Sequence, residues 1–323
     1  MMMRSVLSAA SPTVAVEITR HRIAAASIVA RDSAPAVASH AVEPLPAGAI
    51  TPSLNATNIA DPSAVADALG RALDRMGTRP KRIALAIPDS VTKVSLLRFE
   101  KVPERDHDLM ELVRWQVRKA APFKIEDAVL SYVPGFTAAD GSTEFVVVMA
   151  RKDIIQEYES VCAAVGAQAG IVDLATFNVI NAVLATANAP AEDWLLVHVT
   201  EEDATMAILR GSHLVFFRNR AAEGEASLAD MVHQTAMYYE DRLSGTGFSR
   251  VLLAGAGSPV TQGASDADYL RRALEQRLTI RVDQVDPREA ASLTDRITAS
   301  PELLDALAPL VGLIVRERRE RAA

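Results

Sequence analysis

Short apolar segments of strand length alternate with helical patterns along most of the chain, and this alternation predicts an α/β fold. In the first part of the sequence, residues 14–18 and 23–30 have strand patterns, and the proline-punctuated stretch 35–62 leaves room for a third strand and a loop. Residues 61–77 predict a helix, because an Asp-Pro pair suits its first turn and a glycine ends its apolar periodicity. The apolar residues 82–88 then predict a buried strand.

The second half of the sequence repeats this order of three strands, a helix and a buried strand. Two units of the same order indicate an internal duplication, so we expect two related lobes. A further helix, a strand and a long C-terminal helix complete the second unit. The segments of this half are residues 194–200, 205–209, 213–218, 227–243, 250–254, 269–278, 279–285 and 301–318.

Between the two units lies a block that does not belong to the repeat, at about residues 91–171. Its order of strand, helix, two strands and helix is compact enough to pack one helical layer on one small sheet. We therefore predict a first lobe at residues 13–92 and 172–192, an inserted α+β subdomain at residues 93–171, and a second lobe at residues 193–318.

The composition is that of an ordinary globular protein, with 49% apolar and 23% charged residues. The formal net charge is −7, and the basic residues are scattered rather than gathered into a stripe, so nucleic acid is not an expected partner. Cys162 is the only cysteine, which excludes an internal disulfide and a cysteine-based metal cluster and fits a reducing compartment. Its apolar helical surroundings favour a buried small hydrophobe over a reactive thiol.

The sequence contains no stretch of about 18 consecutive apolar residues, so we expect no transmembrane helix and no direct membrane insertion. The short apolar start of the chain passes straight into strand-like sequence, and we interpret it as a ragged start and not as a signal peptide. These features predict a soluble protein, and any membrane association should come through partners.

Three segments along the duplicated frame carry recognisable motifs. Residues 113–132 contain a helix that ends in Pro-Phe, then an acidic pair, then a strand with an aromatic residue. Residues 150–153 lead into a helix, and residues 172–182 pass from a strand to a helix with an aspartate at the junction. In this order the segments resemble the PilM branch of the actin-like superfamily, which is related to FtsA. The resemblance spans about residues 14–313 and implies a duplicated actin-like, ribonuclease H-like bilobed fold, with a small α+β subdomain inserted in the first lobe.

The resemblance also implies a cleft that takes ATP and Mg²⁺ between two hairpins, each with an aspartate and a glycine. At the first hairpin, Glu17 stands at the acidic position and Thr19 at the glycine, and bulky basic residues follow. At the second hairpin, His198 stands at the acidic position and Thr200 at the glycine. The second hairpin then continues with three carboxylates, which would repel a polyphosphate unless a metal intervened. These carboxylates are Glu201, Glu202 and Asp203.

Gly255 and Gly257, which follow a buried strand, resemble the family's adenosine loop, although a turn in any α/β protein can carry such glycines. One of three nucleotide elements is thus recognisable, and we predict a pseudo-ATPase with no catalytic residue and no metal site assigned. The sequence leaves open whether ATP and Mg²⁺ bind to the cleft, and whether Glu17 restores metal binding.

If catalysis is weak or absent, the fold serves as a binding surface. The resemblance implies a scaffold in the inner-membrane assembly platform of a type IV pilus, with other platform or motor components as further partners. In such proteins, a groove between the inserted subdomain and the first lobe takes the cytoplasmic tail of a PilN-like bitopic membrane protein. Our candidate contacts are Trp115, Pro122 and Phe123, because exposed aromatic residues at a helix end make good anchors. The alternative is that Trp115 and Phe123 belong to the core of the subdomain.

Two other functions stay open at this point. An active actin-like ATPase would bind ATP with a metal and couple its hydrolysis to assembly. A cytoplasmic part of a type II secretion platform is close in fold, although those relatives usually continue into a transmembrane segment.

Overall fold

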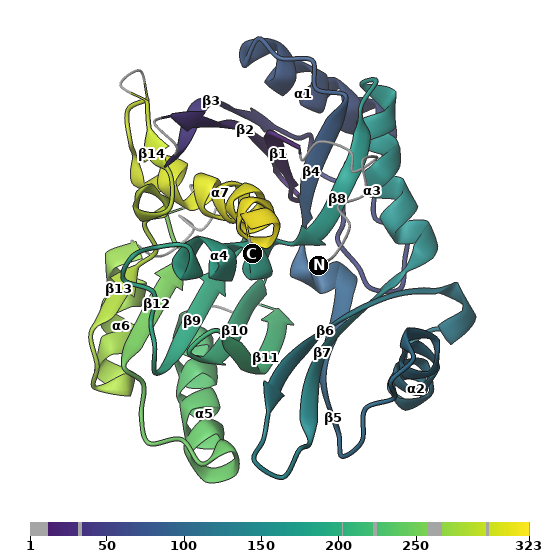
Figure 1. The fold of residues 1–323 in the computed structure, drawn as a ribbon. Coiled ribbons are helices and arrows are strands. Elements are labelled where there is room, and N and C mark those ends of the chain that lie inside the picture. Colours follow the sequence, from purple (N-terminus) through teal and green to yellow (C-terminus); the bar gives the residue numbers. More distant parts are fainter. Residues whose placement is uncertain are drawn as a thin grey trace.

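The computed structural model describes residues 12–31, 34–201, 203–221, 225–257, 267–294 and 297–322, without the side chains of residues 225–227 and 317–322. Glu202, one of the predicted hairpin carboxylates, lies outside this part of the chain. Figure 1 shows two sheet-based lobes and a smaller third unit with a sheet of its own. None of the helices described is long and apolar enough to cross a membrane.

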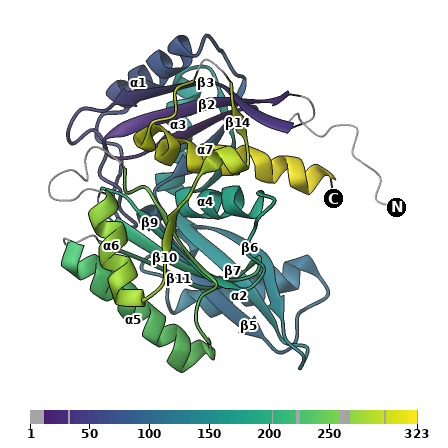
Figure 2. The same cartoon turned by 90° about the vertical axis from the view of Figure 1, so that its left-hand side faces the viewer.

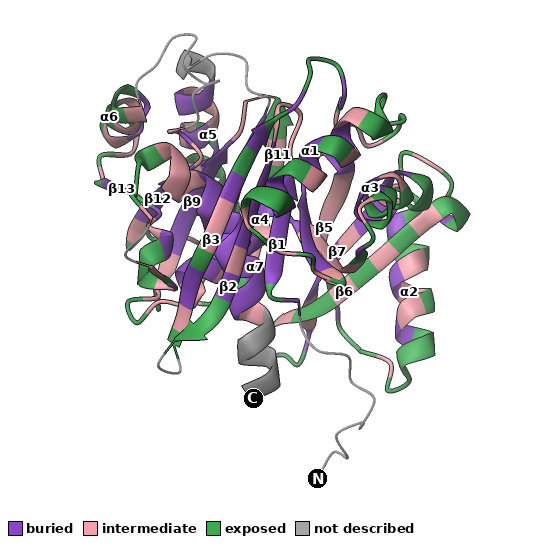
Figure 3. Ribbon diagram, turned by 90° about the horizontal axis from the view of Figure 1, so that it is seen from above, coloured by how far each residue is buried: buried purple, intermediate pink, exposed green. Residues whose placement is uncertain are grey.

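The first sheet contains the strands β1 (Val14–Ile18), β2 (Arg22–Arg31), β3 (Ala34–Pro44), β4 (Arg82–Ile87), β8 (Gln168–Leu174) and β14 (Ser292–Leu293). Their order in the sheet is β14-β3-β2-β1-β4-β8. Strands β1, β2 and β3 pair as antiparallel hairpins, whereas β4 lies parallel to β1 and β8 lies parallel to β4. Strand β1 is buried along its whole length (Figure 3), as expected for a strand that is covered on both faces.

Helices cover both faces of the first sheet. On one face lies α1 (Pro62–Arg75), which begins where predicted, because the Asp61 side chain accepts a hydrogen bond from the N–H of Ala64 at 3.0 Å. Helix α3 (Lys152–Ala164) packs beside α1 on the same face. The opposite face is covered by the C-terminal helix α7 (Pro301–Ala322), as Figure 2 shows.

The second sheet repeats the topology of the first. It contains β9 (Asp193–Val199), β10 (Asp203–Arg210), β11 (His213–Ala221), β12 (Arg250–Ala254) and β13 (Val282–Gln284). The order β11-β10-β9-β12-β13 again joins an antiparallel meander to two parallel strands, and this confirms the predicted duplication. Helices α5 (Glu225–Leu243) and α6 (Ala267–Leu278) cover one face, and α4 (Ala175–Leu184) covers the other.

The third unit follows β4 through the short helix η1 (Asp89–Val91). It contains β5 (Thr92–Phe99), α2 (Asp106–Arg118), η2 (Ile125–Asp127), β6 (Ala128–Thr137) and β7 (Thr143–Arg151). Its sheet has the order β5-β7-β6, and α2 packs on one face of it. Residues of β6 alternate between this face and the other, so Leu130 and Tyr132 pack toward α2 while Val129 and Val133 stay exposed.

Four elements pack differently from the predicted division of the chain. We placed α4 in the first lobe, but it covers the second sheet. We placed α3 and the start of β8 in the inserted subdomain, but β8 pairs with β4, and the side chains of Tyr158 and Cys162 put α3 in the core of the first lobe. We placed α7 in the second lobe, but its residues 306–315 pack largely on the first sheet. The order of elements along a chain does not tell which sheet an amphipathic helix covers, and only tertiary packing decides it.

Candidate functional site

The two lobes contribute hairpin turns of the same construction to the cleft between them. In the β1–β2 turn, the Thr19 hydroxyl donates to the carbonyl of Arg22 at 3.1 Å and accepts from the N–H of Arg22 at 3.2 Å. In the β9–β10 turn, the Thr200 hydroxyl donates to the carbonyl of Asp203 at 3.2 Å and accepts from its N–H at 3.1 Å. A threonine side chain therefore closes each turn at the position where close phosphate approach would require a glycine.

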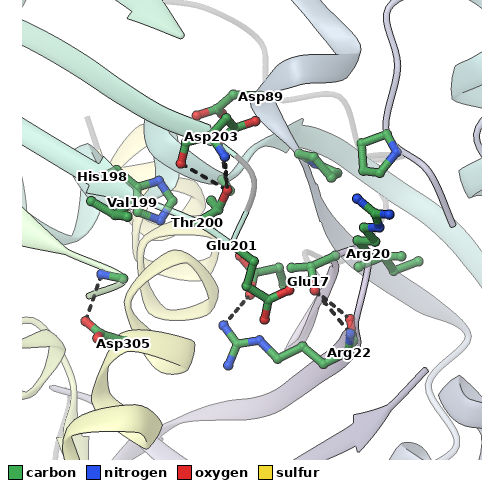
Figure 4. Close-up of a pocket in the computed structure, with 16 residues that line it drawn as sticks. Glu17, Arg20, Arg22, Asp89, His198, Val199, Thr200, Glu201, Asp203 and Asp305 are labelled. Carbon is green, nitrogen blue, oxygen red and sulfur yellow. Dashed lines mark hydrogen bonds and ion pairs between the residues drawn. The ribbon is translucent and has the colours of Figure 1, made fainter. Parts of the chain in front are cut away.

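Glu17 lies buried at the end of β1 and faces Arg22, with 3.5 Å between its Oε2 and the Arg22 Nη2 (Figure 4). Burial raises the pKa of Glu17 above its usual value, and the Arg22 guanidinium opposes this shift. Across the cleft, His21 Nε2 and Glu201 Oε2 are 3.2 Å apart, so the two hairpins are in direct contact.

His198 lies buried at the end of β9 and is linked to the first lobe. Its Nδ1 is 2.7 Å from the hydroxyl of Thr176, which itself donates to a carboxylate oxygen of Asp89. Because the Thr176 proton is used in that bond, His198 Nδ1 must carry the proton that joins the two side chains. Burial lowers the pKa of His198 to about 4, so the ring is neutral near pH 7.

Asp89 joins the two lobes at the back of the cleft. It follows β4 in the first lobe, and its Oδ2 accepts a hydrogen bond at 2.7 Å from the hydroxyl of Thr205 on β10 of the second lobe. Asn219 in turn donates to Thr205 at 2.9 Å. Burial raises the pKa of Asp89, and the hydrogen bonds from Thr176 and Thr205 oppose the shift.

The glycine turn after β12 is occupied by a carboxylate of the protein itself. The N–H of Gly255 donates to Asp305 Oδ1 at 2.9 Å, and the N–H of Gly257 donates to Asp305 Oδ2 at 2.6 Å. Gly255 has a φ of +81°, and a side chain there would overlap the carbonyl oxygen of Val199. The structure thus explains this glycine by a close backbone approach within the protein.

The cavity that these groups enclose has a volume of about 50 Å³, whereas sites for nucleotide-sized ligands run to several hundred Å³. Five carboxyl groups line it against the two guanidinium groups of Arg20 and Arg22, so the excess of acidic groups disfavours a polyphosphate. In this arrangement the residues do not fit ATP with Mg²⁺, and the described residues contain no group of three His, Cys, Asp or Glu that could hold a metal ion. The carboxyl groups are those of Glu17, Asp89, Glu201, Asp203 and Asp305.

A much larger cleft, of about 680 Å³, lies between the third unit and the two lobes, and we call it the insert cleft. The exposed face of the small sheet forms one wall, and β8 with α4 forms the other. Most of its surface is apolar, and Arg316 pairs with Asp173 at its edge. Its lining includes Val129, Ser131, Val133, Val146, Val148, Ala150, residues 169–174, Phe177, Ile180, Leu184, Leu214 and Arg316.

The sequence profile of the type IV pilus assembly protein PilM matches residues 15–244 of the chain. The chain belongs to the PilM family. A chain in a solved structure described as a PilM-PilN type IV pilus biogenesis complex is 19% identical to it, with a TM-score of 0.80, and the match covers 94% of this chain and 98% of that chain.

A Bacteroides thetaiotaomicron protein with an actin-like ATPase fold and unknown function is 8% identical, with a TM-score of 0.50, over 86% of this chain and 91% of that chain. At these identities the likenesses show the fold alone, and they confirm the predicted actin-like architecture. A search of curated proteins finds no match.

The structure brings six of the residues predicted from the PilM resemblance to one cleft or its edge. Glu17, Thr19, His198, Thr200 and Gly255 line the small cavity, and Gly257 bonds to Asp305 beside it. Four further residues of the network went unrecognised in the sequence, and they are Asp89, Thr176, Thr205 and Asp305. The sequence could have indicated Asp89, because it lies two residues beyond the end of the buried parallel strand β4, and such strand ends border the binding cleft of α/β proteins.

The candidate partner contacts lie away from the insert cleft. Trp115 is 63% exposed on α2, and Pro122 is exposed just beyond that helix. Phe123 is half-buried and packs against the core between α2 and the small sheet. None of the three lines the insert cleft, so their contact with a partner stays a prediction.

Proposed function

We propose that this PilM-family protein is a cytoplasmic scaffold at the inner membrane that holds the tail of a PilN-like bitopic membrane protein in the insert cleft, without turning over ATP. Other components of the pilus platform or motor are its expected further partners. The match to a chain from a PilM-PilN complex supports the choice of a PilN-like tail as the first ligand to test.

The observation that carries this proposal is that terminal strands of two different sheets, β6 and β8, border the insert cleft. In the described part of the chain, each pairs with a neighbouring strand on one side only, so its other side offers backbone N–H and C=O groups. Two backbone groups of β8 are already bonded, because the Gly170 carbonyl accepts from Arg82 and the Leu174 N–H donates to the Asp173 side chain. An extended peptide can add to such an edge as a further strand. Residues 169–174 of β8 border the cleft, and a strand of this length spans about 20 Å.

The side chains of the cleft suit an apolar peptide. Val129 and Val133 leave 43% and 53% of their surface exposed on the face of the sheet that borders the cleft. Exposed apolar side chains gathered in one concave site favour binding of a ligand that covers them. Alternate side chains of an added strand would point toward these valines, and they supply the specificity of such binding.

Three features of the small cavity support the absence of ATP turnover. Threonine side chains close both hairpin turns, the glycine turn holds Asp305, and the carboxyl groups that line the cavity would repel phosphate. A protein that does not use nucleotide energy can still assemble a platform by binding its components.

Fluorescence anisotropy with a labelled synthetic peptide tests the proposed function. The peptide is the N-terminal cytoplasmic tail of the PilN-like protein from the same genome. We expect micromolar or tighter binding, or about −8 kcal/mol or more favourable. Val133→Asp should weaken it at least about tenfold, because a charge would enter an apolar contact. Trp115→Asp, at a similarly exposed position on α2, is the matched control and should bind as the wild type does.

Two results would contradict the proposal. One is a tail that does not bind the wild-type protein. The other is binding that Trp115→Asp abolishes and Val133→Asp leaves unchanged, which would move the tail site to α2 as the sequence predicted. Circular dichroism of both variants shows whether their fold is intact.

A further inference from the structure

Asp305 connects the two lobes, although most of the buried residues that follow it on α7 belong to the core of the first. Leu307, Leu310 and Ile314 of this helix pack on the first sheet, while Ala308 packs in the second lobe. The glycine turn that Asp305 contacts follows β12 in the second sheet. The carboxylate therefore bridges a helix fixed to the first lobe and a loop fixed to the second.

The groups that Asp305 occupies are of the kind that binds anions. Successive backbone N–H groups in a glycine turn after a strand point at one place and attract negative charge. Here Gly255 and Gly257 each donate to a different oxygen of the same carboxylate, at 2.9 and 2.6 Å. A Cβ at residue 257 would also lie 2.8 Å from Asp305 Oδ2, so the turn and the carboxylate are in close contact.

We infer that Asp305 is an intramolecular ligand of the glycine turn: an autoinhibitory contact that excludes a nucleotide from this turn and holds the lobes together in its place. This inference rests on the proposed absence of ATP turnover and names the residue responsible. Asp89 with Thr205 and His21 with Glu201 bridge the lobes beside Asp305.

Removal of the Asp305 charge tests the inference directly. Asp305→Asn keeps the size of the side chain, but its amide nitrogen cannot accept a hydrogen bond from a glycine N–H. We expect this variant to bind ADP at least about tenfold more tightly than the wild-type protein, measured by calorimetry at fixed salt. Glu302→Gln removes one charge from the same helix and serves as the matched control, because Glu302 does not bond to the glycine turn in the described contacts.

Equal ADP affinities of Asp305→Asn and the wild type would overturn the inference, and so would an equal gain in Glu302→Gln. If Asp305→Asn fails to fold, amide hydrogen exchange on the unmodified full-length protein decides. We expect the N–H groups of Gly255 and Gly257 to exchange slowly without ligand and no more slowly with ADP. Fast exchange without ligand, or added protection with ADP, would overturn it. Tail binding to the insert cleft is measured separately, so failure of either claim leaves the other intact.

Discussion

Gly312 of α7 crosses Asn178 of α4 so closely that a Cβ at residue 312 would overlap the carbonyl oxygen of Asn178. The crossing is the point where the lobes exchange helices, because α4 leaves the first lobe and covers the second sheet, while α7 follows the second lobe and covers the first. The Asn178 side chain is buried there and donates to the carbonyl of Leu174 at 2.8 Å. Glycine at residue 312 therefore allows the two lobes to pack as one body.

Gly312→Ala should destabilise the protein by at least about 2 kcal/mol, because the overlapping atoms are backbone and the helices must move apart. Gly70→Ala is the matched control in α1, where a Cβ would have its closest neighbour, Val165 Cγ1, at 4.0 Å. That variant should be more stable by about 0.5–1 kcal/mol, because alanine favours the helix. Urea unfolding measures both, and equal midpoints would contradict the close crossing.

The bond between Thr205 and Asp89 should contribute to stability across the lobe boundary. Thr205→Val keeps the shape of the side chain but removes a donor from a buried carboxylate, and we expect a loss of about 1–3 kcal/mol. Thr137→Val, at the exposed end of β6, removes a hydroxyl that bonds only to Thr143 in the described contacts and should cost less than about 0.5 kcal/mol. Similar losses of unfolding free energy in the two variants would argue against a stabilising bond between Thr205 and Asp89.

His198 should make stability depend on pH. Burial holds its pKa at about 4 in the folded protein, against a usual value of 6.5. The folded state thus binds the proton more weakly than the unfolded state, and the stability from this group, present above pH 6.5, falls as the pH drops toward 4. Between pH 8 and pH 5 this loss amounts to about 2 kcal/mol.

The buried carboxyl groups around His198 change the stability with pH in the opposite direction. Burial raises the pKa values of Asp89, Asp203 and Asp305, so each favours the folded state as the pH falls. Comparison with His198→Gln isolates the histidine. The stability advantage of the wild type should shrink by about 2 kcal/mol between pH 8 and pH 5. An advantage that stays constant over this range would show that His198 is not held neutral by burial.

Calorimetric titration with ATP and Mg²⁺ should give no binding heat and no thermal shift, because the threonine turns occupy the places that phosphates would need and Asp305 occupies the glycine turn. Addition of glycine at both turns, as Thr19→Gly with Thr200→Gly, should not restore binding while Asp305 is present. A micromolar signal from the wild-type protein, about −8 kcal/mol, would instead favour the active ATPase.

Much of the fold could be predicted because the local patterns were consistent with it. The Asp-Pro start of α1, the tight turn before β11 and the two three-strand meanders all have short-range signals, and repetition of the order indicated the duplication. The covering of the first sheet by α3 and α7 could not be predicted, because a helix with one apolar face fits any sheet of suitable size.

The candidate site could be predicted only in part, for the same reason. Glu17, Thr19, His198 and Thr200 lie next to strand ends, where a family resemblance assigns them a place. Asp305 lies 48 residues from Gly257, and no local pattern connects a polar residue in a C-terminal helix with a turn in another lobe. Such a contact follows only from packing α7 on the first sheet.

The central claim, that the insert cleft holds a partner tail, is tested most directly by a crystal structure of the protein with the tail peptide of the PilN-like protein bound. We predict an extended peptide in the insert cleft that pairs with the backbone of β6 or β8 and covers Val129 and Val133. A peptide bound on α2 beside Trp115, with an empty insert cleft, would contradict the account.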